Sequence, residues 1–393
     1  MWINDQPTTW EWAKNSADGL KVIQGQVFWN LVESGQPVQV SLDGPDDPAR
    51  LIMPGAAATL RQRKTGRPLF DRYIVADYSG ASSEILQRRS ICIADATAKR
   101  PIARVAGKFT RESLLAFFLR TLRSATDQGC RCLLGCDHQY GVPLGFAELL
   151  GLETQDWRTL LHQLVIGANG VPSLEHPKFY CRKVNQWLVA RGHLPYFYTA
   201  TKASQYSDKQ YIDGTECLIV PATDPRGDRP EAERNRLVRR LTEQFWALSG
   251  QPKFFNRVGD NGTVGGQSIL GLEKFYGLLA LTADSIPLAV WPFDGPDLDS
   301  SAYEGRHVLV EPYPSGVRPT DVMQTDWDDA KSCVQALRNA DFNGQLAGLL
   351  SFRSVCGECI RRVRMEGWIA LNPVRSLNSP AGACRFCSNS LNF

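Results

Sequence analysis

The chain has 393 residues, of which 43% are hydrophobic and 22% are charged, a balance typical of a globular protein rather than of a disordered or fibrous one. Its 44 Lys and Arg residues against 41 Asp and Glu residues give a formal net charge of +3, so nucleic-acid binding would have to come from a local basic patch. No apolar run approaches the ~18 residues of a membrane span and no signal-peptide pattern opens the chain, so we expect a cytoplasmic protein without a membrane partner.

Residues 1–70 are predicted to form a small β-rich appendage. Residues 22–29 and 38–42 have strand composition, with Gly and Pro between them. A basic loop follows at residues 61–68. It is typical of a solvated linker, and a phosphate-contacting arm is the alternative.

Three later segments share one pattern, an apolar run that ends in an acid. Residues 73–76 precede Asp77, residues 132–136 precede Asp137, and residues 308–310 precede Glu311. Short runs rich in Val, Ile, Leu and Tyr indicate buried strands. Each strand therefore delivers one carboxylate at its carboxyl end.

The elements between the first two acids predict the start of a sheet. Residues 89–94 and 101–106 have strand patterns with short polar connections, which favours an antiparallel meander with residues 73–77. Thr110 can cap a helix that ends at Gln128, before the strand at residues 132–136. We therefore expect an α/β protein with a mixed sheet and helices on both faces.

A long, mainly helical insertion is predicted at about residues 145–250, including a charged helix at residues 229–248. Its tract of bases and aromatics suits single-stranded nucleic acid, with Lys178, Arg182 and Lys183 as candidate phosphate contacts. The alternative is that its rings pack on the core.

A Gly-rich loop at residues 259–268 then precedes a predicted helix at residues 269–281. Such a loop can direct backbone N–H groups at phosphate, with Gly265, Gly266 and Gln267 as the candidate contacts. It matches neither common phosphate-binding fingerprint, so a plain turn is the alternative.

The last predicted core elements are a strand at residues 286–293, the strand that ends at Glu311, and a helix from Asp326 through Leu337. The helix begins with three acids, Asp326, Asp328 and Asp329. Capping and the helix dipole also favour acids at this position.

Four carboxylates at neighbouring strand and helix ends need a common explanation. Like charges in one cleft repel, and a pair of Mg²⁺ or Mn²⁺ ions removes that cost while activating water for phosphodiester cleavage. Asp77, Asp137, Glu311 and Asp328 are the predicted ligands, with Asp329 in reserve. Ser79 and His138 are candidate substrate contacts beside two of these acids, and a structural role is the alternative for His138.

The order strand, strand, strand, helix, strand, with acids at these ends, resembles the ribonuclease H-like fold. More narrowly, it is similar to an uncharacterised branch of that superfamily known only as predicted nucleases. The resemblance rests on residues 76–81, 137–143, 263–272, 290–293, 310–314 and 366–369. It implies a ribonuclease H-like domain over residues 71–370 that acts on nucleic acid.

The sequence departs from this family at one acid. Aligning the helix on residues 333–337 puts Lys331 where the family carries its acid. Asp328 lies one turn earlier on the same helix face and is expected to replace it. If it does not, the fold would serve binding rather than cleavage.

In a cytoplasmic protein, the eleven cysteines are expected to be thiols or metal ligands rather than disulfides. Four form two CxxC pairs, Cys356 with Cys359 and Cys384 with Cys387, separated by 24 residues. Two close pairs are typical of a structural Zn²⁺ site. One alternative is a reactive thiol at a helix start, and another is four unrelated cysteines with the last 20 residues disordered. Residues 371–393 are the predicted Cys-containing C-terminal tail.

The sequence thus predicts a metal-dependent nuclease, a hydrolase of phosphodiester bonds in DNA or RNA. A non-catalytic binding module on the same fold is one alternative. A nucleotide phosphotransferase-like protein that uses the Gly-rich loop is the other.

Overall fold

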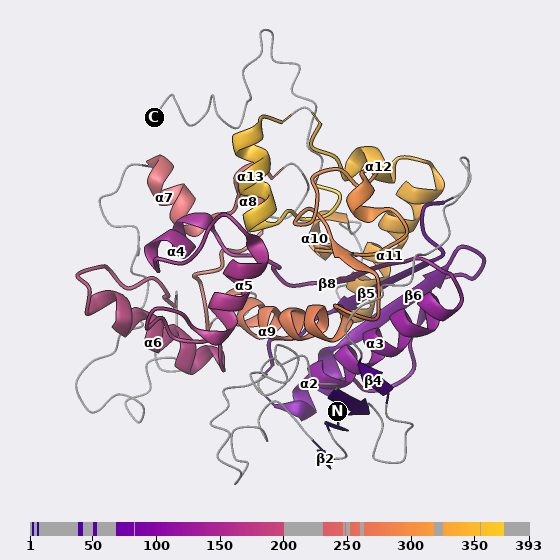
Figure 1. Ribbon diagram of the computed structural model, residues 1–393, viewed down its shortest axis with the longest axis horizontal. Helices are drawn as coiled ribbons and strands as arrows, with labels where there is room; N and C mark the ends of the chain where they lie inside the picture. Colours follow the sequence, from indigo (N-terminus) through magenta and orange to yellow (C-terminus); the bar gives the residue numbers. More distant parts are fainter. Residues whose placement is uncertain are drawn as a thin grey trace.

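Figure 1 shows the computed structural model of the chain. The structure describes the backbone of four short strands near the N-terminus and most of the chain from residue 68 to residue 372. The described ranges are 2–3, 6–7, 38–41, 50–52, 68–81, 83–199, 231–246, 248, 252–259, 263–317, 325–353 and 355–372.

The four N-terminal strands form a sheet of their own. β1 (Trp2–Ile3), β2 (Gln6–Pro7), β3 (Val38–Ser41) and β4 (Arg50–Ile52) pair antiparallel in the order β2-β1-β3-β4. The predicted strand at residues 38–42 is therefore present. The predicted strand at residues 22–29 lies outside the described residues, as does residues 61–67 of the basic loop.

The main sheet has six strands in the order β7-β6-β5-β8-β10-β9. β7, β6 and β5 pair antiparallel with one another. β5, β8, β10 and β9 pair parallel, so β5 joins the two halves of the sheet. The strands are β5 (Arg72–Asp77), β6 (Cys92–Thr97), β7 (Ala103–Arg104), β8 (Cys132–Cys136), β9 (Leu288–Val290) and β10 (His307–Val310).

The predicted antiparallel meander is confirmed, but its second strand begins later than expected. Helix α2 (Glu84–Ser90), capped by the Ser83 side chain, occupies the chain up to Ser90. The sequence prediction missed this helix. The predicted mixed α/β class, with a mixed sheet, is confirmed.

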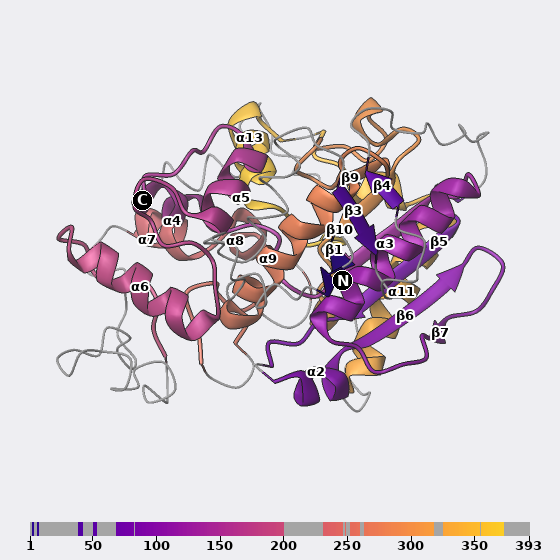
Figure 2. The same ribbon diagram turned by 60° about the horizontal axis from the view of Figure 1, so that its bottom comes forward.

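Strand alternation divides the buried residues into two cores, one on each face of the sheet. Ile74 and Ala76 of β5 pack with helix α3 (Arg111–Asp127) and helix α9 (Gly265–Thr282). Tyr73 and Val75 point the other way and pack with helix α11 (Asp326–Phe342). α3 and α11 therefore cover opposite faces, as Figure 2 shows.

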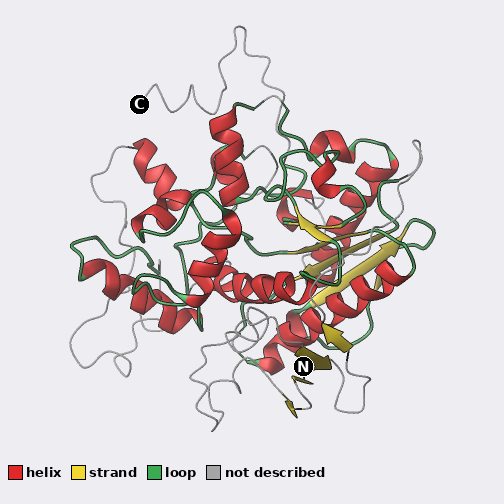
Figure 3. Cartoon of the chain, viewed as in Figure 1, coloured by secondary structure: helices red, strands yellow, loops and turns green. Residues whose placement is uncertain are grey.

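The helices of the predicted insertion gather to one side of the main sheet, as Figure 3 shows. They are α4 (Leu144–Leu149), α5 (Trp157–Ile166), α6 (Pro177–Val189), α7 (Glu231–Val238) and α8 (Leu241–Gln244). The single helix expected at residues 229–248 is instead two, because Arg239 and Arg240, between α7 and α8, are not helical and Arg240 is extended.

The remaining described elements are short or close the chain. They are the 3-10 helix Ser301–Tyr303, α10 (Pro314–Val317), α12 (Leu346–Leu349) and α13 (Gly357–Glu366). None of the helices described is long and apolar enough to cross a membrane.

Candidate acidic site at the ends of two parallel strands

Asp77 and Asp137 lie side by side because β5 and β8 are parallel neighbours. Ala76 pairs with Cys136, and the Asp137 amide donates a 3.0 Å hydrogen bond to the Ala76 carbonyl. By alternation both acids follow their strands onto the face covered by α11. Both are half-buried, so they line an accessible edge rather than the core.

Helix α11 brings two further carboxylates to this edge. Its N-cap, Thr325, accepts a hydrogen bond from the Asp328 amide and so fixes the first turn. Asp326 shares a side-chain hydrogen bond with Asp77, and Asp329 interacts electrostatically with both strand acids. We call Asp77, Asp137, Asp326 and Asp329 the acidic cluster.

The cluster holds more negative charge than its surroundings offset. Burial and then the neighbouring Asp137 raise the pKa of Asp77 well above its usual value. Burial, Asp329 and then Glu311 raise the pKa of Asp137 to about 8. Burial and Asp329 also raise the pKa of Asp326, a shift that the hydrogen bond with Asp77 and then the charge of Arg104 partly oppose. The carboxylates therefore do not all ionise together at neutral pH.

Two thiols lie against the cluster without joining it. Cys333 is buried one helical turn after Asp329, and burial and the nearby acids raise its pKa well above the usual value. Cys92, the register partner of Asp77, accepts a 2.8 Å hydrogen bond from the Arg104 side chain. Protonated thiols add no charge to the site.

The donor set of the acidic cluster fits a hard divalent cation in its chemistry. Mg²⁺ and Mn²⁺ prefer carboxylate oxygens, and the raised pKa values mark negative charge that a cation would offset. As the side chains stand, no group of three or more His, Cys, Asp or Glu among the described residues is positioned to hold a metal ion. Binding would therefore require side-chain rotation at these ends.

Asp328, the predicted fourth ligand, does not belong to the cluster. Its carboxylate accepts a 2.5 Å hydrogen bond from the Thr325 hydroxyl, so it serves the cap of α11. Asp329, predicted as a reserve ligand, is the acid of α11 whose charge acts on Asp137. Lys331, which stands where the resembling family carries its acid, is exposed. Asp326 was interpreted only as a capping acid. The spacing of Asp326, Asp329 and Cys333 (three and four residues) is the signal that could have identified this helix face.

Glu311 also differs from its predicted role as a metal ligand. Its two carboxylate oxygens each accept a 2.7 Å hydrogen bond from the Arg240 guanidinium, and one accepts a further bond from the Tyr140 amide. By alternation Glu311 follows Leu309 onto the α9 face of the sheet, opposite the face of Asp77 and Asp137. The sequence pattern of an acid after each strand did not distinguish the two faces.

Arg240 is the centre of a buried charge network at this point. It is 0% exposed, and it also donates to Glu243, which in turn accepts a 2.9 Å hydrogen bond from Gln139. Arg240 comes from the insertion and Glu311 from the main sheet. The network therefore connects the two parts of the protein.

His138 is a core residue rather than a substrate contact. Its ring lies between those of Tyr78 and Tyr140, at centroid distances of 4.7 Å and 4.9 Å, and Nδ1 is 3.0 Å from the Gln139 carbonyl oxygen. Burial lowers its pKa to about 4, so it is neutral at physiological pH. The close approach of Gly271 leaves no room for a side chain against this ring.

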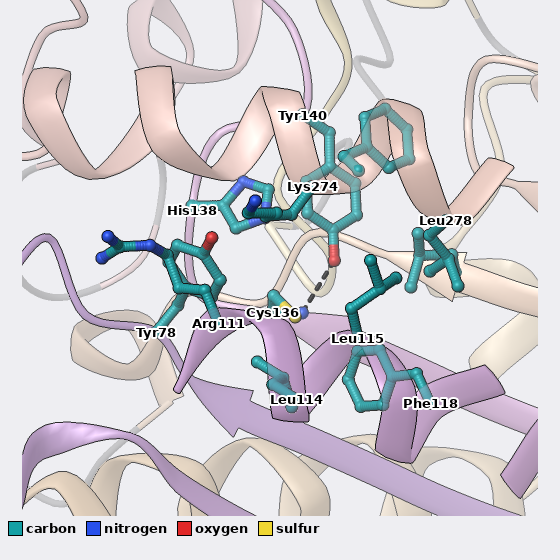
Figure 4. A pocket seen from close by; sticks show the side chains of 12 residues that line it. Tyr78, Arg111, Leu114, Leu115, Phe118, Cys136, His138, Tyr140, Lys274 and Leu278 are labelled. Atoms are coloured by element: carbon teal, nitrogen blue, oxygen red, sulfur yellow. Dashed lines mark hydrogen bonds between the residues drawn. The ribbon is translucent and has the colours of Figure 1, made fainter. Parts of the chain in front are cut away.

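A small cavity lies behind the strand ends, on the α3 and α9 face. Figure 4 shows Tyr78, Cys136, His138 and Tyr140 lining it together with apolar side chains of α3 and α9. These residues alternate with Asp77 and Asp137 along the chain, so they point away from the acidic cluster. Its volume of about 30 Å³ holds about two water molecules, too little for a substrate.

Gln267 ties the two strand ends together. Its side-chain amide donates a 2.6 Å hydrogen bond to the Tyr78 carbonyl and a second bond to the Asp137 carbonyl. The first turn of α9 is thereby anchored next to both strand acids. The prediction places Gln267 in contact with substrate, whereas in the structure its side-chain amide is hydrogen-bonded to backbone carbonyl groups.

The other predicted contacts near this turn are structural. A side chain at Gly265 would overlap the carbonyl oxygens of Phe255 and Arg257, so this glycine permits close packing rather than phosphate binding. Gly266 is half-buried in the first turn of α9. The Ser79 hydroxyl accepts a hydrogen bond from the Ala81 amide within its own turn. Residues 260–262 of the Gly-rich loop lie outside the described residues.

The remaining predicted residues lie away from the acidic cluster. Lys178, Arg182 and Lys183 are on α6, and α9 lies between α6 and the strands in Figures 1 and 2. Cys356 is the N-cap of α13 and Cys359 is buried in its first turn. Cys384 and Cys387 lie outside the described residues, so the Zn²⁺ site remains a prediction.

The chain matches no family model, no curated protein and no solved structure.

Proposed function

We propose that this protein is a metal-dependent nuclease that hydrolyses phosphodiester bonds of nucleic acid on a ribonuclease H-like fold. The observation that carries the proposal is the acidic cluster, in which Asp77 and Asp137 end adjacent parallel strands and the pKa of each is raised by burial and by a neighbouring carboxylate, Asp137 for Asp77 and Asp329 for Asp137. The strand order, with three antiparallel strands followed by a helix and a parallel strand, supports the same fold.

Asp77, Asp137, Asp326 and Asp329 are the residues that would hold the cation, in place of the set containing Glu311 and Asp328. A bound Mg²⁺ or Mn²⁺ would polarise a phosphate group and lower the pKa of water. The protein side chains supply carboxylate oxygens on an accessible edge, and Gln267 fixes the spacing of the two strands that carry them.

The test is cleavage of labelled single- and double-stranded DNA and RNA in Mg²⁺ or Mn²⁺. We expect the wild type to cut at least one substrate, and we expect Asp77→Asn and Asp137→Asn each to lose most of that activity. Asp328→Asn is the matched control, because Asp328 lies on the same helix but outside the cluster. Equal cleavage by all four proteins, or none by the wild type, contradicts the proposal.

Two observations favour a second candidate, a nucleic-acid-binding module without turnover. Glu311 is committed to Arg240, and among the described residues no group of acids is already positioned for a metal ion. Binding of all substrates with cleavage of none, unchanged in Asp77→Asn, would favour this candidate.

A further inference from the structure

Arg104 lies on the same face of the main sheet as the acidic cluster. In the register of β6 and β7 it pairs with Ala94, which packs in the core that α11 covers. Cross-strand partners point to the same face of a sheet, and so do residues two apart on one strand. Arg104 therefore shares the α11 face with Cys92 and with Asp77, the register partner of Cys92.

The guanidinium of Arg104 is held near the cluster by a thiol rather than by a carboxylate. One of its nitrogens donates a 2.8 Å hydrogen bond to Cys92 Sγ, and sulfur is a weak acceptor. Among the described residues no carboxylate forms an ion pair with Arg104, although its charge acts on Asp326. A guanidinium has five N–H donors, so one bond to a thiol leaves most of them for another acceptor.

The position of Arg104 also leaves its side chain accessible. β7 is the outermost strand of the main sheet on this side, as Figure 2 shows, and both of its residues are exposed. The acidic cluster is therefore bordered on the β7 side by an exposed cation. A divalent cation in the cluster and Arg104 would carry charge of the same sign, so a group that contacts both of them favourably has to be an anion.

We propose that Arg104 binds a phosphate group of the nucleic-acid substrate beside the acidic cluster, on its β7 side. The inference rests on the nuclease function and names the phosphate contact of that site. The planar fork of arginine matches two oxygens of one phosphate, a geometry that a lysine ammonium cannot reproduce. Arg104 thus positions the backbone of the substrate over the edge where Asp77 and Asp326 meet.

A purely structural role for Arg104 makes a different prediction. If its charge only offsets that of Asp326, replacing it with alanine lowers the stability of the folded protein and leaves the binding of phosphate unchanged. A phosphate contact instead contributes to the salt dependence of nucleic-acid binding, because it displaces a counterion from the backbone. The salt dependence therefore separates the two roles.

The test measures binding, in a protein that needs no metal ion. Asp77→Asn/Asp137→Asn removes two negative charges from the cluster, which is the charge that one divalent cation would offset. Fluorescence anisotropy with a labelled 20-nucleotide single strand and with the matching duplex is recorded in EDTA over a salt series. Adding Arg104→Ala should weaken binding about tenfold. It should lower the salt slope by about 0.7 for the single strand or about 0.9 for the duplex, the values for one lost phosphate contact.

Two matched variants serve as controls in the same Asp77→Asn/Asp137→Asn protein. Arg104→Lys keeps the charge without the fork, so it should keep the salt slope and recover only part of the affinity. Arg100→Ala removes an exposed arginine from the β6–β7 connection, past the other end of β6, and should bind as its parent does. Thermal unfolding checks that each variant is folded.

Calorimetry with Mn²⁺ shows whether Arg104→Ala damages the acidic cluster itself. In an otherwise wild-type protein this variant should bind Mn²⁺ at least as tightly as the wild type, because it removes a like charge from beside the cluster. Weaker binding of Mn²⁺ with unchanged binding of nucleic acid would mean that Arg104 supports the carboxylates, and it would overturn the assignment.

The outcomes distinguish this inference from the nuclease proposal. Unchanged affinity and salt slope in Arg104→Ala, an equal loss in Arg100→Ala, or no binding of either probe overturns the phosphate contact. A wild type that cuts nothing, although Arg104→Ala loses the contact, overturns the nuclease and leaves a phosphate-binding site. Cleavage by the wild type, with Arg104→Ala binding as its parent does, gives the reverse result.

Discussion

Replacing Asp137 with asparagine is expected to stabilise the metal-free protein, although most substitutions at partly buried positions destabilise. An acid whose folded-state pKa lies above its ordinary value binds protons more tightly when folded. Asp137 has an ordinary pKa of 3.8 and a folded-state pKa of about 8. The wild type therefore loses stability as the pH rises from about 4 to about 8, and Asp137→Asn, which does not titrate, avoids this loss.

The magnitude follows from the size of the pKa shift. One pKa unit corresponds to about 1.4 kcal/mol, so a rise of about four units sets an upper limit of about 6 kcal/mol. Asp137 is half-buried, and water screens part of the repulsion from Asp329. We therefore expect Asp137→Asn to raise the free energy of unfolding by about 1–3 kcal/mol at pH 8 and by much less at pH 4.

Urea-induced unfolding in EDTA at pH 4, 6 and 8 measures this difference directly. Asp328→Asn is the control, because it keeps the carbonyl oxygen that bonds to Thr325 and lies outside the cluster. Adding Mn²⁺ at pH 8 should stabilise the wild type more than Asp137→Asn. A stability difference that is absent, or that is the same at all three pH values, would refute the electrostatic argument.

Three further substitutions test other parts of the structure. Arg240→Met leaves both Glu311 and Glu243 buried without their cation and should cost about 3–5 kcal/mol in urea unfolding. Combining it with Glu311→Gln should recover part of that loss, and equal losses in both proteins would count against the pair of Arg240 with Glu311. Gln267→Ala should lower the affinity for Mn²⁺ severalfold, as measured by calorimetry, and should change the free energy of unfolding by only about 1–2 kcal/mol. An unchanged affinity would show that Gln267 does not position the strand acids. Gly271→Ala should destabilise by about 1–3 kcal/mol in thermal unfolding through overlap with the His138 ring, and a neutral result would mean that the ring moves aside.

The sequence predicted the strands that carry the acids because each is a short apolar run closed by a polar turn. β5, β8 and β10 all appear where expected, and the Thr110 cap of α3 is confirmed with both bonds of its capping box. Local signals of this kind depend on a few adjacent residues. They are therefore visible in a single sequence.

The composition of the acidic cluster could not be obtained the same way. Whether an acid after a strand faces α11 or α9 depends on strand register, and one residue reverses the face. Glu311 falls on the face opposite to Asp77 for this reason. In the first turn of α11, each of three acids could either cap the helix or bind a metal ion. Only the structure shows that Asp328 bonds to the N-cap residue Thr325, while Asp326 bonds to Asp77 of β5.

The bond between Arg240 and Glu311 has a consequence for how this protein can be shortened. Excising the insertion would remove the Arg240 guanidinium and leave the Glu311 carboxylate with the Tyr140 amide but without its cation, so the shortened sheet is expected to be less stable unless that residue is also changed. The insertion and the sheet are expected to melt as one cooperative unit. A natural chain of this fold without the insertion should carry an uncharged residue in place of Glu311.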